Sequence, residues 1–174
     1  MEFSHFDEDG NAVMVDVSGK EITQRRALAE AEQIRLASAE DRSEIGATIM
    51  GAVSRIAVKP GDKVKKGDVL TVAQVAGIMG TKRTAELIPM CHLLNLTNSE
   101  VRFEMNPEEL EIKAFCQVKT EGKTGVEMEA LTGVSTALLT IYDMCKAIDK
   151  RMVIEEIHLC EKSGGKSGTF MFEK

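Results

Sequence analysis

The sequence lacks an excess of basic residues. Its 174 residues include 22 lysines and arginines against 28 aspartates and glutamates, which gives a formal net charge of −6. Proteins that bind nucleic acid usually present a basic stripe, so we predict no nucleic-acid partner. A small anionic ligand is compatible with this composition, because local basic clusters can lie on an acidic surface. Such clusters occur at Arg25–Arg26, Lys63–Lys66, Lys82–Arg83 and Lys162/Lys166.

The sequence also lacks long apolar runs and closely spaced cysteines. No apolar stretch reaches the roughly 20 residues that a transmembrane helix needs, and no apolar signal segment lies near the N-terminus. We therefore expect a cytoplasmic protein without a membrane partner. Zinc sites are usually recognisable from short spacings such as Cys-x-x-Cys, so we expect no metal site and reduced thiols. The scattered cysteines are Cys91, Cys116, Cys145 and Cys160.

The length and composition indicate one domain. A chain of this length with 43% hydrophobic residues can bury one core, so we expect residues 1–174 to form a single domain. Residues 1–12 and the glycine-rich residues 163–174 are expected to be flexible. Alternation of apolar and polar residues over 94–105 and 110–120, separated by Asn-Pro-Glu-Glu, predicts a β-hairpin.

The remaining segments predict further strands and helices. Residues 24–36 are ambiguous, because their alanine and glutamate content favours a helix whereas their alternation favours a strand. We also expect a strand at 13–17, a helix at 43–56, a helix at 67–88 and a last strand at 152–160. This mixture predicts an α+β fold of two layers, in which helices pack on an antiparallel sheet.

The stretch KTGVEMEALTGVSTALLTIYDMCK carries the strongest indication of function. It reads as one long apolar helix with Glu127 and Glu129 at its start and Asp143 and Lys146 near its end. Ionisable groups on a buried helix are costly to desolvate unless they are paired, and burial next to other charges shifts pKa values. Acid–base catalysts arise in this way, so the helix points to a function as well as to a fold.

These features also have structural explanations. Thr124 and Glu127 fit a helix capping box, and Asp143 with Lys146 fits an intrahelical ion pair. His92 is either a partly buried structural residue or a donor to a substrate's base or phosphate. The motif GGKS lacks the earlier glycine and the following helix of a phosphate loop, although its amides and neighbouring lysines could form an anion-binding lid.

The length of the long helix limits how its charged ends can be used. Glu129 and Asp143 are 14 positions apart, which places them on nearly the same face but about 21 Å apart along the axis. One helix therefore cannot bring both side chains to the same reactive atom. Either the ligand is long, like a nucleoside triphosphate, or each site combines opposite helix ends from two subunits. We infer a homo-oligomer with shared sites as a hypothesis.

Taken together, the sequence resembles the molybdenum cofactor biosynthesis protein C family, MoaC, over nearly the whole chain. Two departures from the family pattern are Leu93, where a proline is usual, and a longer segment between Ser38 and Lys66. The motifs that carry the resemblance are MVDVS (14–18), KGDVL (66–70), AGI (76–78), LIPMCH (87–92), KTGVEMEALTGVS (123–135), TIYDMCKA (140–147) and EKSGGKSG (161–168).

The resemblance implies a lyase that converts (8S)-3′,8-cyclo-7,8-dihydroguanosine 5′-triphosphate to cyclic pyranopterin monophosphate and releases diphosphate. It implies a ferredoxin-like two-layer sandwich, with residues 24–36 as a strand. It also implies a homohexamer, a trimer of dimers with sites at subunit interfaces, and no cofactor or metal. The rival interpretation is a non-catalytic module that binds a GTP-like nucleotide.

The resemblance assigns roles to individual residues. It implies that Asp143 and Lys146 are the catalytic pair that moves protons, and that Met128 and Glu129 contact the guanine-derived ring. The other expected substrate-binding residues are Met90, Cys91 and His92 in the pocket, Glu127 at the helix start, Arg25, Lys66, Lys82 and Lys162 at the triphosphate, and Asp16 in the N-terminal motif.

Overall fold

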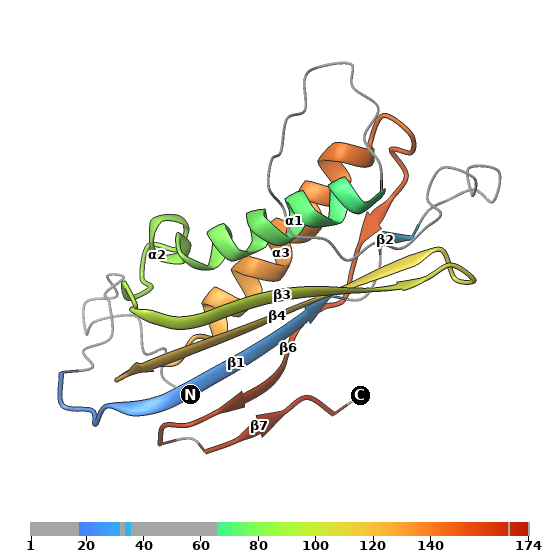
Figure 1. Ribbon diagram of the computed structural model, residues 1–174. Coiled ribbons are helices and arrows are strands. Elements are labelled where there is room, and N and C mark those ends of the chain that lie inside the picture. Colours follow the sequence, from blue (N-terminus) through green and yellow to red (C-terminus); the bar gives the residue numbers. More distant parts are fainter. Residues whose placement is uncertain (1–17, 32–33, 36–65, 167, 174) are drawn as a thin grey trace, which may run out of the picture.

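Strand β1 (Thr23–Ala31) is the middle strand of a five-stranded antiparallel sheet. The computed structural model describes residues 18–31, 34–35, 66–166 and 168–173 (Figure 1). The strand order is β3-β4-β1-β6-β7, with β3 at Leu96–Asn106, β4 at Glu111–Gly122, β6 at Ile157–Ser163 and β7 at Phe170–Met171. Strands β2 (Ile34–Arg35) and β5 (Val153–Ile154) pair separately.

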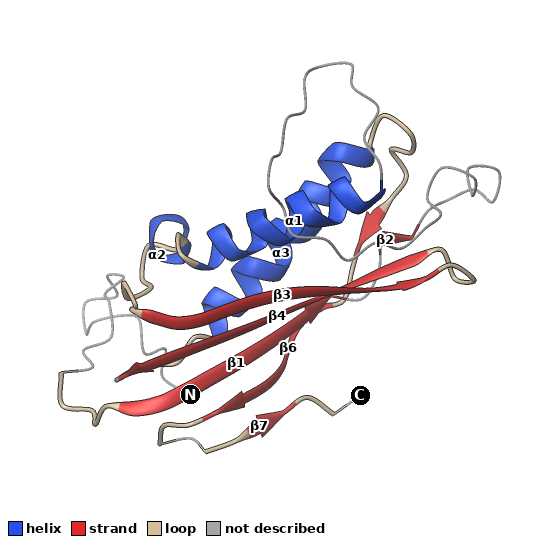
Figure 2. Ribbon diagram, in the orientation of Figure 1, coloured by secondary structure: helices blue, strands red, loops and turns tan. Residues whose placement is uncertain are grey.

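Helices α1 (Lys66–Thr81), α2 (Thr84–Leu87) and α3 (Glu127–Cys145) lie on one face of the sheet (Figure 2). The predicted α+β class with two layers is therefore confirmed. The main elements follow one another as β1-α1-β3-β4-α3-β6, with β1 and β4 central. This is the ferredoxin-like arrangement.

The alternation of residues along β1 agrees with burial of one face of the sheet under the helices. Ala27 and Ala29 of β1 are fully buried against the helices, which explains why residues of this segment form a strand despite their helix-favouring composition. The predicted hairpin is also confirmed. Its turn is closed by the Asn106 Oδ1 atom, which accepts hydrogen bonds from the backbone N–H groups of Glu108 and Glu109 at 3.1 and 3.3 Å.

Several predicted boundaries are wrong. The single helix expected over 67–88 is divided into α1 and α2, because threonine hydroxyls bond local carbonyls where α1 ends. Thr81 Oγ1 donates to Ile78 O at 2.8 Å, and Thr84 Oγ1 donates to Thr81 O at 3.1 Å. The strand expected over 152–160 is interrupted at Glu156, which has a positive φ of 53°. The elements expected at 13–17 and 43–56 lie outside the described residues.

The C-terminal tail contributes to the sheet. Residues 163–174 were expected to be flexible, but Phe170 and Met171 form β7 and pair with Lys162 and Glu161 of β6. Among the described helices, none has the length and apolar character needed to cross a membrane.

Helices α1 and α3 approach closely through glycines. A Cβ atom on Gly77 would lie 2.9 Å from the Gly133 carbonyl oxygen, and one on Gly133 would lie 2.5 Å from the buried Cys116 Sγ atom. Gly77 also lies against Ala137, and Thr81 lies against Gly133, so the two helices run antiparallel (Figure 1). The absence of side chains at these positions lets the helix layer pack on the sheet.

We predict that Gly133→Ala lowers the free energy of unfolding by about 1–3 kcal/mol. Alanine favours a helix over glycine by about 1 kcal/mol, so a net loss must come from crowding against Cys116 and Thr81. Urea unfolding would measure the change. Gly122→Ala is a matched control, because the nearest atom to its Cβ is 3.9 Å away. Equal stability of Gly133→Ala and the wild type would contradict the prediction.

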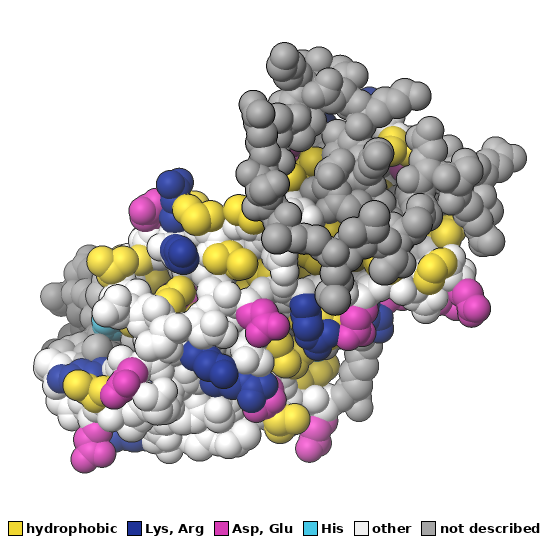
Figure 3. Space-filling model, viewed as in Figure 1, with side chains coloured by type: hydrophobic (Ala, Val, Ile, Leu, Met, Phe, Trp, Pro, Cys, Tyr) yellow, Lys and Arg dark blue, Asp and Glu magenta, His cyan; other side chains and the backbone are white. Residues whose placement is uncertain are grey.

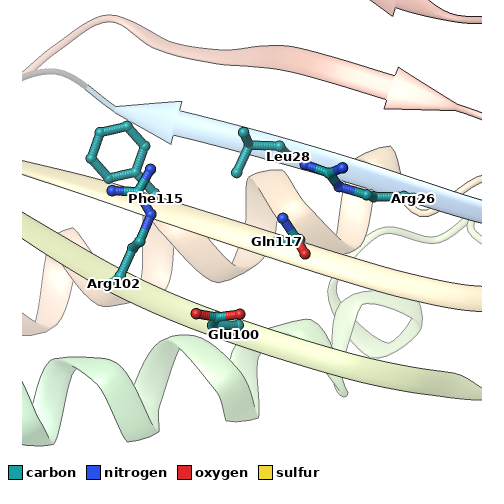
Figure 4. A pocket seen from close by; sticks show the side chains of 6 residues that line it. All are labelled: Arg26, Leu28, Glu100, Arg102, Phe115 and Gln117. Atoms are coloured by element: carbon teal, nitrogen blue, oxygen red, sulfur yellow. The ribbon is translucent and has the colours of Figure 1, made fainter.

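The other face of the sheet carries no described helix and has a small pocket. Figure 4 shows Arg26, Leu28, Glu100, Arg102, Phe115 and Gln117 around it, with the helices behind the strands. The Arg102 guanidinium lies 3.7 Å from the centre of the Phe115 ring, a cation–π contact.

Candidate active site

Most of the predicted site residues converge at one end of the sheet. Strand β1 begins there, β4 and β6 end there, and α3 begins there after a short connection from β4 (Figure 1). The loop that precedes β3 reaches the same end, because Leu96 of β3 pairs with Thr120 of β4. The topology therefore gathers motifs that are far apart in the sequence.

Glu127 is held by an ion pair and not by a capping box. The residue before α3 is Val126, which makes no side-chain capping hydrogen bond, so the predicted box is wrong. Instead, Glu127 Oε1 lies 3.0 Å from Lys162 Nζ of β6. Both side chains are partly buried, with exposed fractions of 29% and 25%, so the pair is better shielded from solvent than most surface pairs.

Glu129 is the most strongly perturbed carboxyl of this cluster. Its exposed fraction is 4%, and burial raises its pKa from 4.5 to about 7. The charge of Glu127 adds to the rise, and a hydrogen bond from the backbone N–H of Glu129 opposes it. A carboxyl that titrates near neutral pH can both give and take a proton during a reaction.

Cys91 is close enough to Glu129 for the charge of the carboxylate to act on its thiol. Burial raises the pKa of the Cys91 thiol, and the charge of Glu129 raises it further, so Cys91 is a neutral thiol that can line a pocket but is a poor nucleophile. The Cys91 backbone N–H donates to Ile88 O at 3.0 Å, which fixes the turn after α2. Met90 and His92 flank it and are half-buried, and Met128, next to Glu129 in α3, is 38% exposed.

Arg25 packs against the glycine turn that follows β6. Its Nε atom donates to Gly122 O at 3.0 Å, and a Cβ on Gly165 would lie 2.1 Å from its Nη1 atom. Gly164 and Gly165 have φ values of 90° and 81°, and a Cβ on Gly164 would lie 2.1 Å from Gln24 O. Sequence reasoning missed this role of the two glycines, although the Gly-Gly pair with no following helix is the signal of such a turn.

Asp143 and Lys146 lie at the other end of α3. They form the i,i+3 ion pair that their spacing allows, with exposed side-chain fractions of 71% and 53%. The expectation of a buried helix therefore holds for its middle, where Val134 and Leu138 are fully buried, but not for this end. The structure does not bring Asp143 or Lys146 to Glu129, since the helix rise separates the two ends by about 21 Å.

The remaining predicted residues are distributed between the two ends. Lys82 is exposed just beyond the last residue of α1. Lys66 begins α1, and because α1 and α3 are antiparallel its backbone lies at the Asp143 end (Figure 1). Asp16 lies outside the described residues. Within the part of the chain that the structure describes, no group of three or more His, Cys, Asp or Glu side chains could hold a metal ion.

Comparison with known proteins identifies the family. The model of the MoaC family matches residues 14–165 of this chain. The chain belongs to the MoaC family. It is 52% identical over 171 residues to the cyclic pyranopterin monophosphate synthase of Clostridium botulinum, covering 98% of each chain. Synthases of the same name from Desulfitobacterium hafniense and Natranaerobius thermophilus are 52% and 53% identical, with 95% or more of each chain covered.

Membership of the MoaC family agrees with the resemblance that the motifs predicted. At this identity over nearly the full length, the activity is that of a cyclic pyranopterin monophosphate synthase, a lyase of molybdenum cofactor biosynthesis. The matched range includes every predicted site residue, from Asp16 to Lys162.

Proposed function

We propose that the chain converts (8S)-3′,8-cyclo-7,8-dihydroguanosine 5′-triphosphate to cyclic pyranopterin monophosphate with release of diphosphate. The observation that carries this proposal is the buried Glu129 carboxyl, whose pKa of about 7 suits proton exchange at neutral pH. It lies beside Glu127, which is ion-paired with Lys162. A proton-transfer group and a cation suited to phosphate therefore occupy the same end of the sheet.

We propose that the guanine-derived ring of the substrate binds at the start of α3. The carboxylate form of Glu129 can accept two N–H groups of a guanine-like edge, and its neutral form can donate one hydrogen bond. Met128 supplies an exposed apolar surface beside it. We propose that the neutral Cys91 thiol, with Met90 and His92, surrounds the ring near this carboxyl.

We propose that the triphosphate binds to the cationic side chains around the glycine turn that follows β6. The Nη atoms of Arg25 lie at Gly165, while its Nε atom is already bonded to Gly122 O, so the guanidinium is fixed in orientation. Lys162 can exchange its partner Glu127 for a phosphate oxygen. Positive charge at these positions stabilises the diphosphate as its bond to the α-phosphorus breaks. Lys82, Lys66 and Asp16 are the further candidates.

We propose that the Asp143–Lys146 pair carries out the proton transfers of phosphate cyclisation and ring opening. Closure of the cyclic phosphate requires a base to take the proton of the attacking hydroxyl, and ring opening requires an acid to protonate the leaving atom. A carboxylate and an ammonium in direct contact supply one group of each kind. Because they lie at the far end of α3, we propose that they belong to the site of a neighbouring subunit.

This arrangement requires an oligomer, which we propose is a homohexamer built as a trimer of dimers with sites at subunit interfaces. Apolar side chains exposed on the helix layer support association of subunits, since contiguous exposed apolar surface marks interaction sites. Figure 3 shows apolar side chains gathered over α1 and α2. Of the apolar residues in these two helices, Val75 and Met79 are each 44% exposed and Leu87 is 61% exposed.

The rival function is a module that only binds a GTP-like nucleotide. The test supplies the cyclic GTP-derived triphosphate to the purified protein and measures diphosphate release. The wild type should release diphosphate, and Lys146→Ala should be at least about a hundredfold slower. Lys150→Ala, at another exposed lysine, is the matched control and should keep the wild-type rate. Binding without release by the wild type would establish the rival, and an unchanged rate in Lys146→Ala would remove the assigned role.

A further inference from the structure

A thiol and an imidazole lie together on β6, outside the proposed active site. The Cys160 Sγ atom is 3.9 Å from the His158 Nε2 atom, a distance within the range of the long hydrogen bonds that sulfur forms. Neither residue belongs to the set assigned to the substrate. Cys160 is half-buried and is not part of a disulfide.

The two side chains lie on the same face of β6, because they are two positions apart in the strand. Leu28 of β1 pairs with Glu161, and Ala29 pairs with Leu159, so Cys160 is an extra residue in β6. Leu159 packs into the core against the helices, which directs His158 to the opposite, open face of the sheet. Cys160, two positions further on, faces the same side, in agreement with its contact to His158.

The hydrogen bonding of His158 fixes its tautomer. His158 Nδ1 lies 2.8 Å from the carbonyl oxygen of Glu156, and because a carbonyl can only accept, Nδ1 carries the hydrogen. In the neutral ring Nε2 then has a lone pair, and this is the nitrogen that faces Cys160. Glu156 presents its carbonyl from a left-handed conformation with a φ of 53°, a strained geometry for a residue other than glycine.

The tail completes the surroundings of the pair. The Phe172 ring lies over the His158 ring with centroids 4.2 Å apart, and the Phe172 backbone N–H donates to Cys160 O at 2.8 Å. Phe172 is 46% exposed and covers the imidazole on one side, whereas Cys160 is only half-buried.

The other cysteines are in less reactive environments. Burial raises the pKa of Cys116 to about 12, and burial also raises the pKa of Cys145 and Cys91. Thiolate is the reactive form, so these thiols are expected to react slowly at neutral pH. Cys160 differs from them because a base faces its sulfur.

We propose that His158 activates Cys160 for thiol–disulfide exchange with small-molecule disulfides. The proton of the Cys160 thiol passes to His158 Nε2, and the thiolate attacks one sulfur of the disulfide. The disulfide bond of the reagent breaks and a mixed disulfide forms at Cys160. The other half of the reagent leaves as a thiolate and takes up the proton from the imidazolium.

The test uses dithiodipyridine with the full-length protein and follows release of the pyridinethione by absorbance. The wild type should show one fast thiol per chain, which Cys160→Ser removes and which Cys145→Ser, the matched control, retains. His158→Gln should slow the fast phase about tenfold, because the amide cannot accept the thiol proton. Mass spectrometry of the briefly treated wild type should place the mixed disulfide on Cys160.

Two results would overturn the proposal. One is a mixed disulfide that maps to a different cysteine in the wild type, a measurement that does not depend on how any variant folds. The other is an unchanged fast phase in His158→Gln, which would show that Cys160 reacts without the help of the imidazole.

Discussion

Replacing Glu129 by glutamine should stabilise the protein at pH 8 while lowering its rate of diphosphate release about a hundredfold or more. The rate falls because glutamine cannot give or take the proton that the carboxyl exchanges. The stability rises because the wild type at pH 8 carries an ionised carboxylate in a site that is only 4% exposed. Function is thus expected to cost stability at this position.

The sign of the pH dependence follows from the direction of the pKa shift. The folded protein has a Glu129 pKa of about 7, above the ordinary value of 4.5, so the folded state holds the proton more tightly than the unfolded chain does. The stabilisation by the neutral carboxyl is fully present below pH 4.5 and is lost as the pH rises through about 7. A shift of this size corresponds to about 3 kcal/mol.

Urea unfolding at pH 5 and pH 8, at one protein concentration, would measure this contribution. The wild type should lose more stability than Glu129→Gln between the two pH values, by up to about 3 kcal/mol. Glu86→Gln, at an exposed position of α2, is the matched control and should follow the wild type. An identical pH dependence in Glu129→Gln and the wild type would show that the carboxyl is not perturbed by burial.

The sequence predicted the parts of the fold that local pattern determines. The β3–β4 hairpin was predictable because alternating residues and an asparagine turn act over neighbouring positions. The capping box failed because the Glu127 carboxylate pairs with Lys162, which is distant in sequence and therefore invisible to a local rule. The bulge at Cys160 and the pairing of β7 likewise depend on neighbouring strands, whose register no single segment specifies.

The candidate site was predictable as a set of residues but not as a geometry. The motifs named Glu129 and Cys91, yet their proximity arises because α3 and the loop before β3 meet at one end of the sheet. The exposure of Asp143 could not be read from the apolar sequence around it, since burial depends on which elements cover that end of the helix. The helix rise was predictable, and it separates the two groups of residues within one chain.

Mixing two inactive variants should therefore restore activity. Glu129→Gln keeps an intact Asp143–Lys146 end, and Lys146→Ala keeps an intact Glu129 end. If each site combines Glu129 of one subunit with Lys146 of another, random assembly of equal amounts gives both residues in about a quarter of the sites, one half times one half. Co-expression with two different tags, followed by purification on both, isolates the mixed oligomers for the diphosphate assay.

The control mixture pairs Lys146→Ala with Asp143→Asn. These two residues contact each other within one chain, so no subunit of this mixture has an intact pair and activity should stay at the level of the single variants. Recovery to about a quarter of the wild-type rate in the first mixture alone would place the two ends of α3 in one shared site. If both mixtures are as inactive as their components, each site is complete within one chain, and the substrate must then span the helix from Glu129 to Lys146.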